Sequence, residues 1–162
     1  MSRLCAPRPG IPLPRPTPVS APHWEGCREG RLRVQRCASC GTHVFIPRPF
    51  CTECLSDDLE WVDSSGRGRV YSFTVIHRPQ RPEFEVPYAV VIVELEEGWM
   101  MLSNLVDCEA AQVEIGMPVE VTFRRMSDEI SLPLFRPAEP GRPRERDTGR
   151  LSRESRVPRR EA

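Results

Sequence analysis

The chain has 162 residues, 39% of them hydrophobic, which is enough for one domain or two small ones, and no apolar run reaches the ~18 residues of a membrane span. Its formal net charge of zero hides an asymmetry: residues 1–36 carry +5, residues 136–162 carry +4, and residues 37–135 carry −9. The acidic middle argues against a nucleic-acid surface that follows phosphates, because such a surface should be basic.

Both ends of the chain are predicted to lack a folded core. Residues 1–22 hold seven prolines and are expected to form a disordered or extended Pro/Arg-rich arm. Residues 138–162 are polar and Arg-rich, and they are expected to form a disordered tail. Neither segment has enough large apolar side chains to offset the entropy lost on ordering. The N-terminus also lacks the apolar core of a secretory signal.

Residues 23–65 are predicted to form a short helix followed by a small metal-binding β-structure. His23–Glu29 is the expected helix, with Gly30 as its stop signal. Three short strands are expected at Arg31–Arg36, Thr42–Ile46 and Leu59–Val62. The second of these ends where Pro47 and Pro49 block a helical continuation.

Four cysteines give this segment its chemistry. Cys37, Cys40, Cys51 and Cys54 form two C-x-x-C pairs separated by ten residues, a spacing typical of two knuckles that share one tetrahedral metal ion. Gly41 follows the first pair and suits the tight turn, whereas Leu55 holds the equivalent place in the second pair. Four thiolates close the coordination shell, so the pattern predicts structural Zn²⁺. A rubredoxin-like iron site for electron transfer uses the same ligands and stays an alternative.

The remaining cysteines indicate the compartment. Cys5, Cys27 and Cys108 are scattered, and the total of seven is odd. This usage favours a reducing cytoplasm over a secreted disulfide framework. No activating basic or helix-N-terminal setting is identified around Cys27 or Cys108, so both are interpreted as unreactive thiols.

Residues 66–137 are predicted to form a β-barrel. The segment Gly66-Arg67-Gly68 marks its start, and the region holds no helix of useful length. The five strands are expected at Val70–His77, Tyr88–Leu95, Trp99–Val106, Val119–Arg124 and Ile130–Phe135. Tyr88–Leu95 is almost wholly apolar, which is typical of a strand buried on both faces or curled in a barrel. An OB-fold is the leading candidate, and an SH3-like barrel or a five-stranded meander is the alternative.

These features occur in an order that resembles a known family. The segments HWEGCREGRLRVQRCASCG, FIPRPFCTEC, EWVDSSGRGRVYSFTVIHR, PYAVVIVELEEG, IGMPVEVTF and LPLFRPA are similar to the zinc-ribbon and OB-fold proteins called domain of unknown function 35, DUF35. The resemblance covers about residues 20–137. It departs where His23 replaces the usual aromatic residue and where the second knuckle lacks Gly.

The resemblance implies a non-catalytic accessory subunit of an acyl-CoA enzyme complex. Members of this family pair with a thiolase-like enzyme, meaning a thiolase, aldolase or acyltransferase, and some also contact a hydratase. The resemblance further implies structural zinc, a role in forming a CoA-thioester channel, and an active site that belongs to the partner. The main alternative is a nucleic-acid-binding protein, because zinc ribbons and OB-folds often bind nucleic acids.

No catalytic group is expected in this chain, but a few side chains are candidates for a ligand-facing or partner-facing rim. The aromatic residues Trp24, Phe84 and Tyr88 have the character of interface anchors. His77 and Arg78 follow the first barrel strand, and Arg67 precedes it; arginines there could contact CoA phosphates. Trp99 is expected in the core. Solvated arginines and a hydrogen-bonded His77 at a strand end are the competing interpretation.

Overall fold

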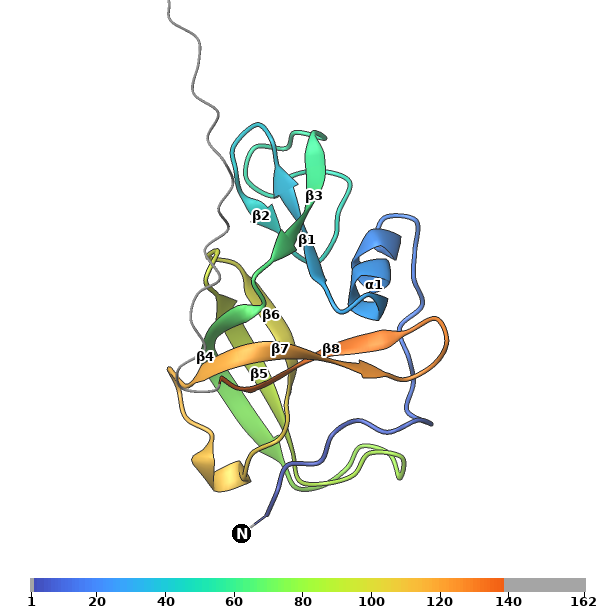
Figure 1. Ribbon diagram of the computed structural model, residues 1–162, viewed down its shortest axis with the longest axis vertical. Helices are drawn as coiled ribbons and strands as arrows, with labels where there is room; N and C mark the ends of the chain where they lie inside the picture. The colour runs from blue at the N-terminus through green and yellow to red at the C-terminus, as the bar shows by residue number, and fades with distance from the viewer. Residues whose placement is uncertain (1, 139–162) are drawn as a thin grey trace, which may run out of the picture.

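The computed structural model describes residues 2–138, which form one short α-helix followed mainly by β-structure, as predicted (Figure 1). Of the predicted C-terminal tail, residues 139–162 lie outside the described residues. In chain order the elements are α1 (Ala21–Arg28), β1 (Leu32–Cys37), β2 (His43–Val44), β3 (Leu59–Ser64), β4 (Arg67–Ile76), β5 (Tyr88–Leu95), β6 (Met100–Leu105), the 3₁₀ helix η1 (Ala110–Gln112), β7 (Pro118–Arg125) and β8 (Ser131–Pro137). Within residues 2–138, no helix combines the length and apolar character needed to cross a bilayer.

The helix α1 begins two residues earlier than predicted. Pro22 lies in its first turn, where the missing N–H of proline costs no hydrogen bond. The preceding turn is fixed by the Ser20 hydroxyl, which accepts a hydrogen bond from the Thr17 backbone N–H at 2.9 Å. The early start places His23 at the third position of the helix, in its first turn, where it is buried.

The first β-module, called the ribbon here, comprises β1, β2 and β3. It is a three-stranded antiparallel sheet in the order β2-β1-β3. The central strand β1 pairs with β3 from Leu32 opposite Ser64 to Cys37 opposite Leu59. β2 is shorter than predicted and pairs with β1 through two residues, Val44 opposite Gln35 and His43 opposite Arg36. The short β2 leaves Phe45 and the residues after it free to turn toward the barrel.

The second module is a closed five-stranded barrel in the order β4-β5-β6-β8-β7, which confirms the predicted OB-fold class. Four of its pairings are antiparallel, and β4 closes on β7 through Arg67, Gly68 and Arg69. The fifth pairing, between β6 and β8, is parallel and rests on one pair, Leu105 opposite Phe135. The Ser103 hydroxyl reinforces this weak seam by donating a hydrogen bond to the Pro133 carbonyl at 2.7 Å.

The simple alternation of inward and outward residues is broken along β4. The pairing with β5 shifts between Val70 and Ser72, which is the mark of a β-bulge. Val70 is therefore buried, Tyr71 is exposed, and Val75 again packs against the core. In β5 the alternation is regular: Ala89, Val91, Val93 and Leu95 point inward, and the intervening apolar residues are half-buried on the outer face.

The ribbon and the barrel share one hydrophobic core. Leu32 and Val34 of β1 belong to the same buried cluster as Trp99 and the inward residues of β5. The rings of Phe45 and Trp99 lie 5.2 Å apart and join the ribbon to the start of β6. Trp99 is buried, as predicted. The two modules are therefore packed as one body and not joined by a free linker.

A carboxylate fixes the connection between the modules. Glu97, in the β5–β6 turn, accepts hydrogen bonds from the Ser65 backbone N–H at 2.6 Å and from the Ser64 hydroxyl at 3.1 Å. Burial raises the pKa of Glu97, but the hydrogen bonds from Ser65 and Ser64 outweigh it and leave the pKa below its ordinary value. Gly66, which follows Ser65, has φ of 69°, and a Cβ at this position would clash with Val121 Cγ1 at 2.2 Å.

The N-terminal arm is extended, which is one of the two alternatives expected from its composition, and it is held against the barrel. Leu4 is 5% exposed and joins the barrel core. Its backbone N–H donates to the Cys108 carbonyl at 3.0 Å, and the Cys5 N–H donates to the Pro87 carbonyl at 2.7 Å. From there the arm runs along the side of the barrel to α1 (Figure 1). One buried leucine and these backbone hydrogen bonds supply the stabilisation that the composition does not reveal.

Leu4→Ala tests whether the arm contributes to stability. The substitution leaves a cavity in the barrel core and is expected to lower the free energy of unfolding by about 2–4 kcal/mol. Ile115→Ala is the control, because Ile115 is 72% exposed and its truncation should change stability by less than about 0.5 kcal/mol. Urea titration measures both; equal midpoints for Leu4→Ala and wild type would show that the arm is dispensable.

Glu97→Ala tests the clamp between the modules. The loss of two hydrogen bonds to a carboxylate should lower the free energy of unfolding by about 1–3 kcal/mol at pH 7. Because the pKa of Glu97 is lowered in the folded state, its contribution is present above the ordinary value of 4.5 and is lost as the pH falls through the lowered pKa. The difference from wild type should therefore shrink on acidification, whereas Glu96→Ala, at an exposed neighbour, should show neither effect.

Candidate metal centre and adjacent grooves

The four predicted metal ligands come together at the end of the ribbon. The sulfur atoms of Cys37, Cys40, Cys51 and Cys54 all lie within 4.8 Å of one another. The Cys37–Cys54 and Cys40–Cys51 Sγ distances are both 3.6 Å. A tetrahedron with Zn–S bonds of about 2.3 Å has edges of about 3.8 Å, so the cluster fits Zn²⁺. The distances are far longer than a disulfide bond of about 2.05 Å.

Each pair of cysteines is shaped by the same backbone turn. The Gly41 N–H donates to the Cys37 carbonyl at 2.8 Å, and the Leu55 N–H donates to the Cys51 carbonyl at 3.2 Å. Both residues adopt the left-handed conformation, with φ of 79° at Gly41 and 62° at Leu55. The second knuckle thus forms despite its missing glycine, with a leucine held in a backbone region that glycine favours.

The thiols of the cluster do not ionise alike. A hydrogen bond with the Thr42 hydroxyl lowers the pKa of Cys40 to about 6. A hydrogen bond at the Ser56 backbone lowers the pKa of Cys54, but hydrogen bonds with the Cys40 and Cys37 thiols raise it to about 12. Four thiolates in contact repel one another, so full deprotonation needs a cation among them. Metal binding at this site is therefore coupled to proton release.

The segment between the two knuckles reaches back toward the barrel. The Gln35 side chain holds it by donating to the Arg48 carbonyl at 3.0 Å and accepting from the Arg48 N–H at 2.7 Å. The ring of Phe45 contacts Trp99 on one side and His23 of α1 on the other, at 5.2 and 5.5 Å between centroids. Since Cys40 and Cys51 flank this segment, a bound ion anchors both of its ends.

His23 is a buried structural residue. Its Nδ1 lies 2.8 Å from the Arg33 carbonyl oxygen and its Nε2 lies 3.7 Å from the Cys27 sulfur. Burial lowers the pKa of His23, against the raising effect of the Arg33 hydrogen bond, and burial raises the pKa of Cys27 to about 12. Both groups are neutral at pH 7, so this contact joins α1 to β1 and supplies no thiolate–imidazolium pair.

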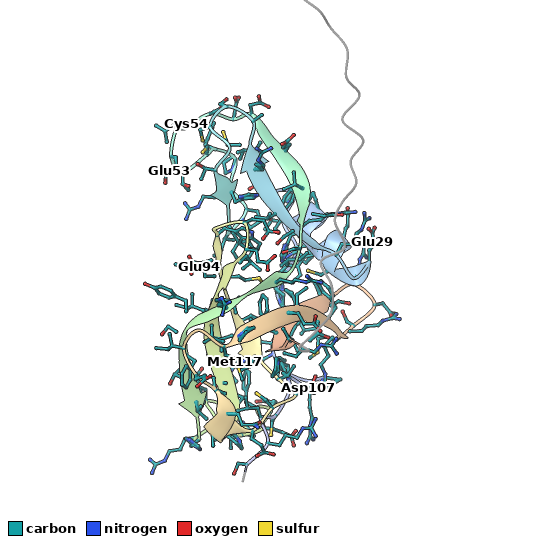
Figure 2. The ribbon with its side chains drawn as sticks, turned by 60° about the vertical axis from the view of Figure 1, so that its left-hand side comes forward. Glu29, Glu53, Cys54, Glu94, Asp107 and Met117 are labelled. Atoms are coloured by element: carbon teal, nitrogen blue, oxygen red, sulfur yellow. The ribbon has the colours of Figure 1, made fainter. Side chains whose placement is uncertain are left out.

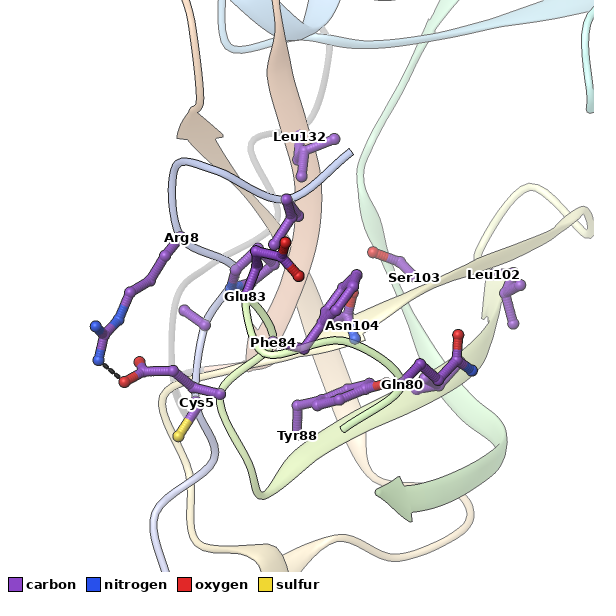
Figure 3. Close-up of a pocket in the computed structure, with 15 residues that line it drawn as sticks. Cys5, Arg8, Gln80, Glu83, Phe84, Tyr88, Leu102, Ser103, Asn104 and Leu132 are labelled. Carbon is purple, nitrogen blue, oxygen red and sulfur yellow. Dashed lines mark ion pairs between the residues drawn. The ribbon is translucent and has the colours of Figure 1, made fainter. Parts of the chain in front are cut away.

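Two connected grooves lie between the arm, α1 and the outer face of the barrel. The larger has a volume of about 610 Å³ and is lined by Trp24, Phe45, Ile46 and Met100 among others. The smaller has a volume of about 340 Å³ and lies between the arm and the loop before β5 (Figure 3). Four residues line both of them: Leu102, Ser103, Asn104 and Leu132.

The predicted rim residues do not form one site. Trp24 lines the larger groove. Phe84 and Tyr88 line the smaller one, with their rings 6.0 Å apart (Figure 3). Arg67 lies in a separate depression beside Glu94 and Glu96.

The other two predicted rim residues, His77 and Arg78, are exposed just after β4. Neither lines either of the two grooves. The fold thus brings Phe84 and Tyr88 together. It does not place His77, Arg78 or Arg67 in the same groove.

The main groove residues were not predicted from the sequence, although the sequence contains a signal for them. Ile46, Met100 and Leu102 are large, apolar and exposed around the larger groove. β5 and β6 carry apolar residues on both faces, although the barrel can bury one face alone. Outward apolar residues in such strands indicate a surface that another molecule covers.

Comparisons with known proteins agree with this architecture. The model described as "ChsH2, rubredoxin-like zinc ribbon domain" matches residues 24–60, and "ChsH2, C-terminal OB-fold domain" matches residues 61–124. A solved structure named "Ltp2-ChsH2(DUF35) aldolase" is similar with a TM-score of 0.71 and 42% identity, covering 77% of this chain and 98% of that chain.

Curated relatives carry related names. A "DUF35 domain-containing scaffold protein" of Methanocaldococcus jannaschii is 41% identical over 58% of this chain and 68% of its own length. A "Probable enoyl-CoA hydratase alpha subunit" of Thermomonospora curvata is 44% identical over 72% of this chain, which spans 37% of that protein. "Benzoylsuccinyl-CoA thiolase subunit BbsA" of Geobacter metallireducens is 36% identical over 46% of this chain and 49% of its own length.

Cys37→Ser tests the metal centre. With one of four thiolates removed, the purified chain should lose its metal and the ribbon its order, because a structural zinc site supplies about 10–16 kcal/mol of apparent folding energy. Cys108→Ser should keep the metal, since Cys108 is buried elsewhere. Elemental analysis of both variants and wild type measures the effect and separates zinc from iron. A Cys37→Ser chain that retained a full equivalent of metal would contradict the ligand assignment.

Proposed function

Because the chain belongs to the DUF35 family of zinc-ribbon and OB-fold proteins, we propose that it is a non-catalytic accessory subunit of an acyl-CoA enzyme complex. Its partner is a thiolase-like enzyme, meaning a thiolase, aldolase or acyltransferase, and a hydratase is a candidate second partner. The observation that carries this proposal is the match over 98% of a chain whose solved structure is named "Ltp2-ChsH2(DUF35) aldolase". The scaffold, hydratase-subunit and thiolase-subunit names of the relatives support the same class.

The chemistry of the described residues supports a non-catalytic role. The Cys27–His23 contact places a thiol beside an imidazole, but burial keeps both neutral. The pKa of Cys108 is also raised by its burial and by the neighbouring acidic residues Asp107 and Glu109. A nucleophilic site needs an activated nucleophile, a base and access for substrate. The buried thiols lack activation and access.

The metal serves the fold in this proposal. The donor set of four thiolates suits Zn²⁺ and leaves no position for water or substrate. The ion would be held by Cys37, Cys40, Cys51 and Cys54, and its effect is to anchor the segment that carries Phe45 and Ile46. Free thiols throughout residues 2–138 fit a reducing compartment such as the cytoplasm.

The connected grooves are the surface that we assign to the complex. Exposed Ile46, Met100 and Leu102 surround the larger groove, and outward apolar residues of this kind are typical of interfaces. Trp24, Phe84 and Tyr88 line the grooves and remain our candidates for contact with the partner or with a CoA thioester that the partner holds. Arg67, His77 and Arg78 lie outside them and are weaker candidates.

The nucleic-acid alternative receives no support from the grooves. Their lining is largely apolar and contains two arginines, Arg8 and Arg15, of which Arg8 is paired with Glu85 (Figure 3). A surface that follows a phosphate backbone needs a row of free cations.

Reconstitution tests the proposal. The tagged chain is used to isolate its thiolase-like partner from the native cells, and both proteins are then purified separately and mixed. We expect a stable complex by size-exclusion chromatography, acyl-CoA turnover by the complex, and no thiolase, aldolase or hydratase turnover by this chain alone. Turnover by the purified chain, or no association with the thiolase-like protein, would defeat the proposal.

A further inference from the structure

The second knuckle contains a leucine that the fold does not require. Leu55 takes the left-handed conformation at φ 62°, the place that Gly41 occupies at φ 79° in the first knuckle. A leucine there is strained, because its Cβ crowds the backbone. Leu55 is also 76% exposed, so its side chain gains no burial within residues 2–138 in return. Glycine would form the same turn without strain and without an exposed apolar side chain.

A second exposed apolar residue borders the same knuckle. Phe50 immediately precedes the ligand Cys51 and is 54% exposed. The small core around the metal consists of Cys37, Val44 and Cys51 with Leu59 against it, and it includes neither Phe50 nor Leu55. Figure 2 shows that this knuckle, marked by Glu53 and Cys54, lies at the end of the ribbon farthest from the barrel. Two large apolar groups are thus presented at a protruding tip.

The tip is strongly acidic. Residues 51–60 contain four acidic residues and no basic residue. Glu60 pairs with Arg36 at 3.4 Å, whereas the carboxylates of Glu53, Asp57 and Asp58 have no ion-pair partner among residues 2–138. Four thiolates around one Zn²⁺ add a net charge of about −2 beside them. The negative charge of the tip favours a binding partner whose contact surface is basic.

We propose that this second-knuckle tip, defined as Phe50, Glu53, Leu55, Asp57 and Asp58, is a docking element for the thiolase-like partner, which receives it in an apolar socket edged by arginine or lysine. The inference rests on the proposed function and adds to it the surface that selects the partner. Apolar side chains at the centre and charges at the edge match the usual anatomy of a protein interface.

Charge distinguishes the thiolase-like partner from other molecules that could cover the tip. A symmetric contact of two copies through their tips would bring two acidic surfaces together, and nucleic acid would bring phosphates to carboxylates, so both contacts are repelled. The chain's own residues 139–162 carry eight arginines, but they contain Leu151 and Val157 as their large aliphatic residues and no aromatic residue. That segment matches the charge of the tip and offers little to cover Phe50 and Leu55.

Leu55→Gly separates docking from a structural role. The substitution removes the exposed side chain and relieves the backbone strain, so the metal content should be unchanged and the melting temperature equal or higher. Affinity for the purified thiolase-like partner, measured by titration calorimetry, should fall by about tenfold or more. Ile115→Ala is the matched control, because Ile115 is 72% exposed, lies between η1 and β7 and so outside the ribbon, and should leave the affinity unchanged.

Charge is tested with the double variant Asp57→Asn/Asp58→Asn. Neither carboxylate makes a hydrogen bond or ion pair within residues 2–138 that the fold would lose. We expect a slower association rate with the partner and a weaker dependence of that rate on salt. An association rate and salt dependence equal to wild type would overturn the acidic part of the docking element.

The outcomes distinguish this inference from the proposed function. If the wild-type chain does not bind the thiolase-like partner, the proposed function fails. If the wild type binds and Leu55→Gly binds with the same affinity, the function stands and the docking element is wrong. A lower melting temperature of isolated full-length Leu55→Gly would show that another part of the chain covers Leu55. Dissociation of a wild-type dimer by the same substitution would show that a second copy does so. Each of these last two results overturns the inference.

Discussion

The contact between the ribbon and the barrel is the interaction on which the rest of the structure depends. Leu32 and Val34 extend the barrel core into the ribbon, and the Phe45 ring bridges Trp99 and His23. This packing buries apolar surface that neither module could cover alone, because a ribbon of this size has almost no core of its own. It also fixes the larger groove, whose walls come from α1, the segment between the knuckles and the barrel strands.

The metal acts on the groove through the same contact. Cys40 and Cys51 flank the segment that carries Phe45 and Ile46, and Gln35 holds its far side through Arg48. An ion at the end of the ribbon therefore contributes to a surface that it does not touch. The binding energy of such a site is large compared with the marginal stability of a small domain. In the function that we propose, a structural metal in this position supports the shape of an interaction surface and takes no part in a reaction.

The properties of this chain fit an accessory subunit whose partner carries the active site, as we propose. A family of accessory subunits needs a rigid surface and has no need of an activated nucleophile, and here the buried thiols are kept neutral while apolar side chains are exposed. In the isolated chain Leu55 carries backbone strain and the large apolar groove residues stay exposed to water. In the proposed complex these side chains would be buried against the partner. Their burial would then contribute to the affinity of binding.

The sequence by itself determined which four cysteines cluster, the five barrel strands and the family, because cysteine spacing and alternating apolar residues are local patterns. It did not reveal the bulge after Val70, which changes the face of every later residue in β4, nor the burial of Leu4 and His23. Nor did it separate Phe84 and Tyr88, which the fold brings together, from His77 and Arg67, which it places elsewhere. Only the tertiary structure decided these points, since each depends on contacts between segments far apart in the chain, whose energies no local pattern records.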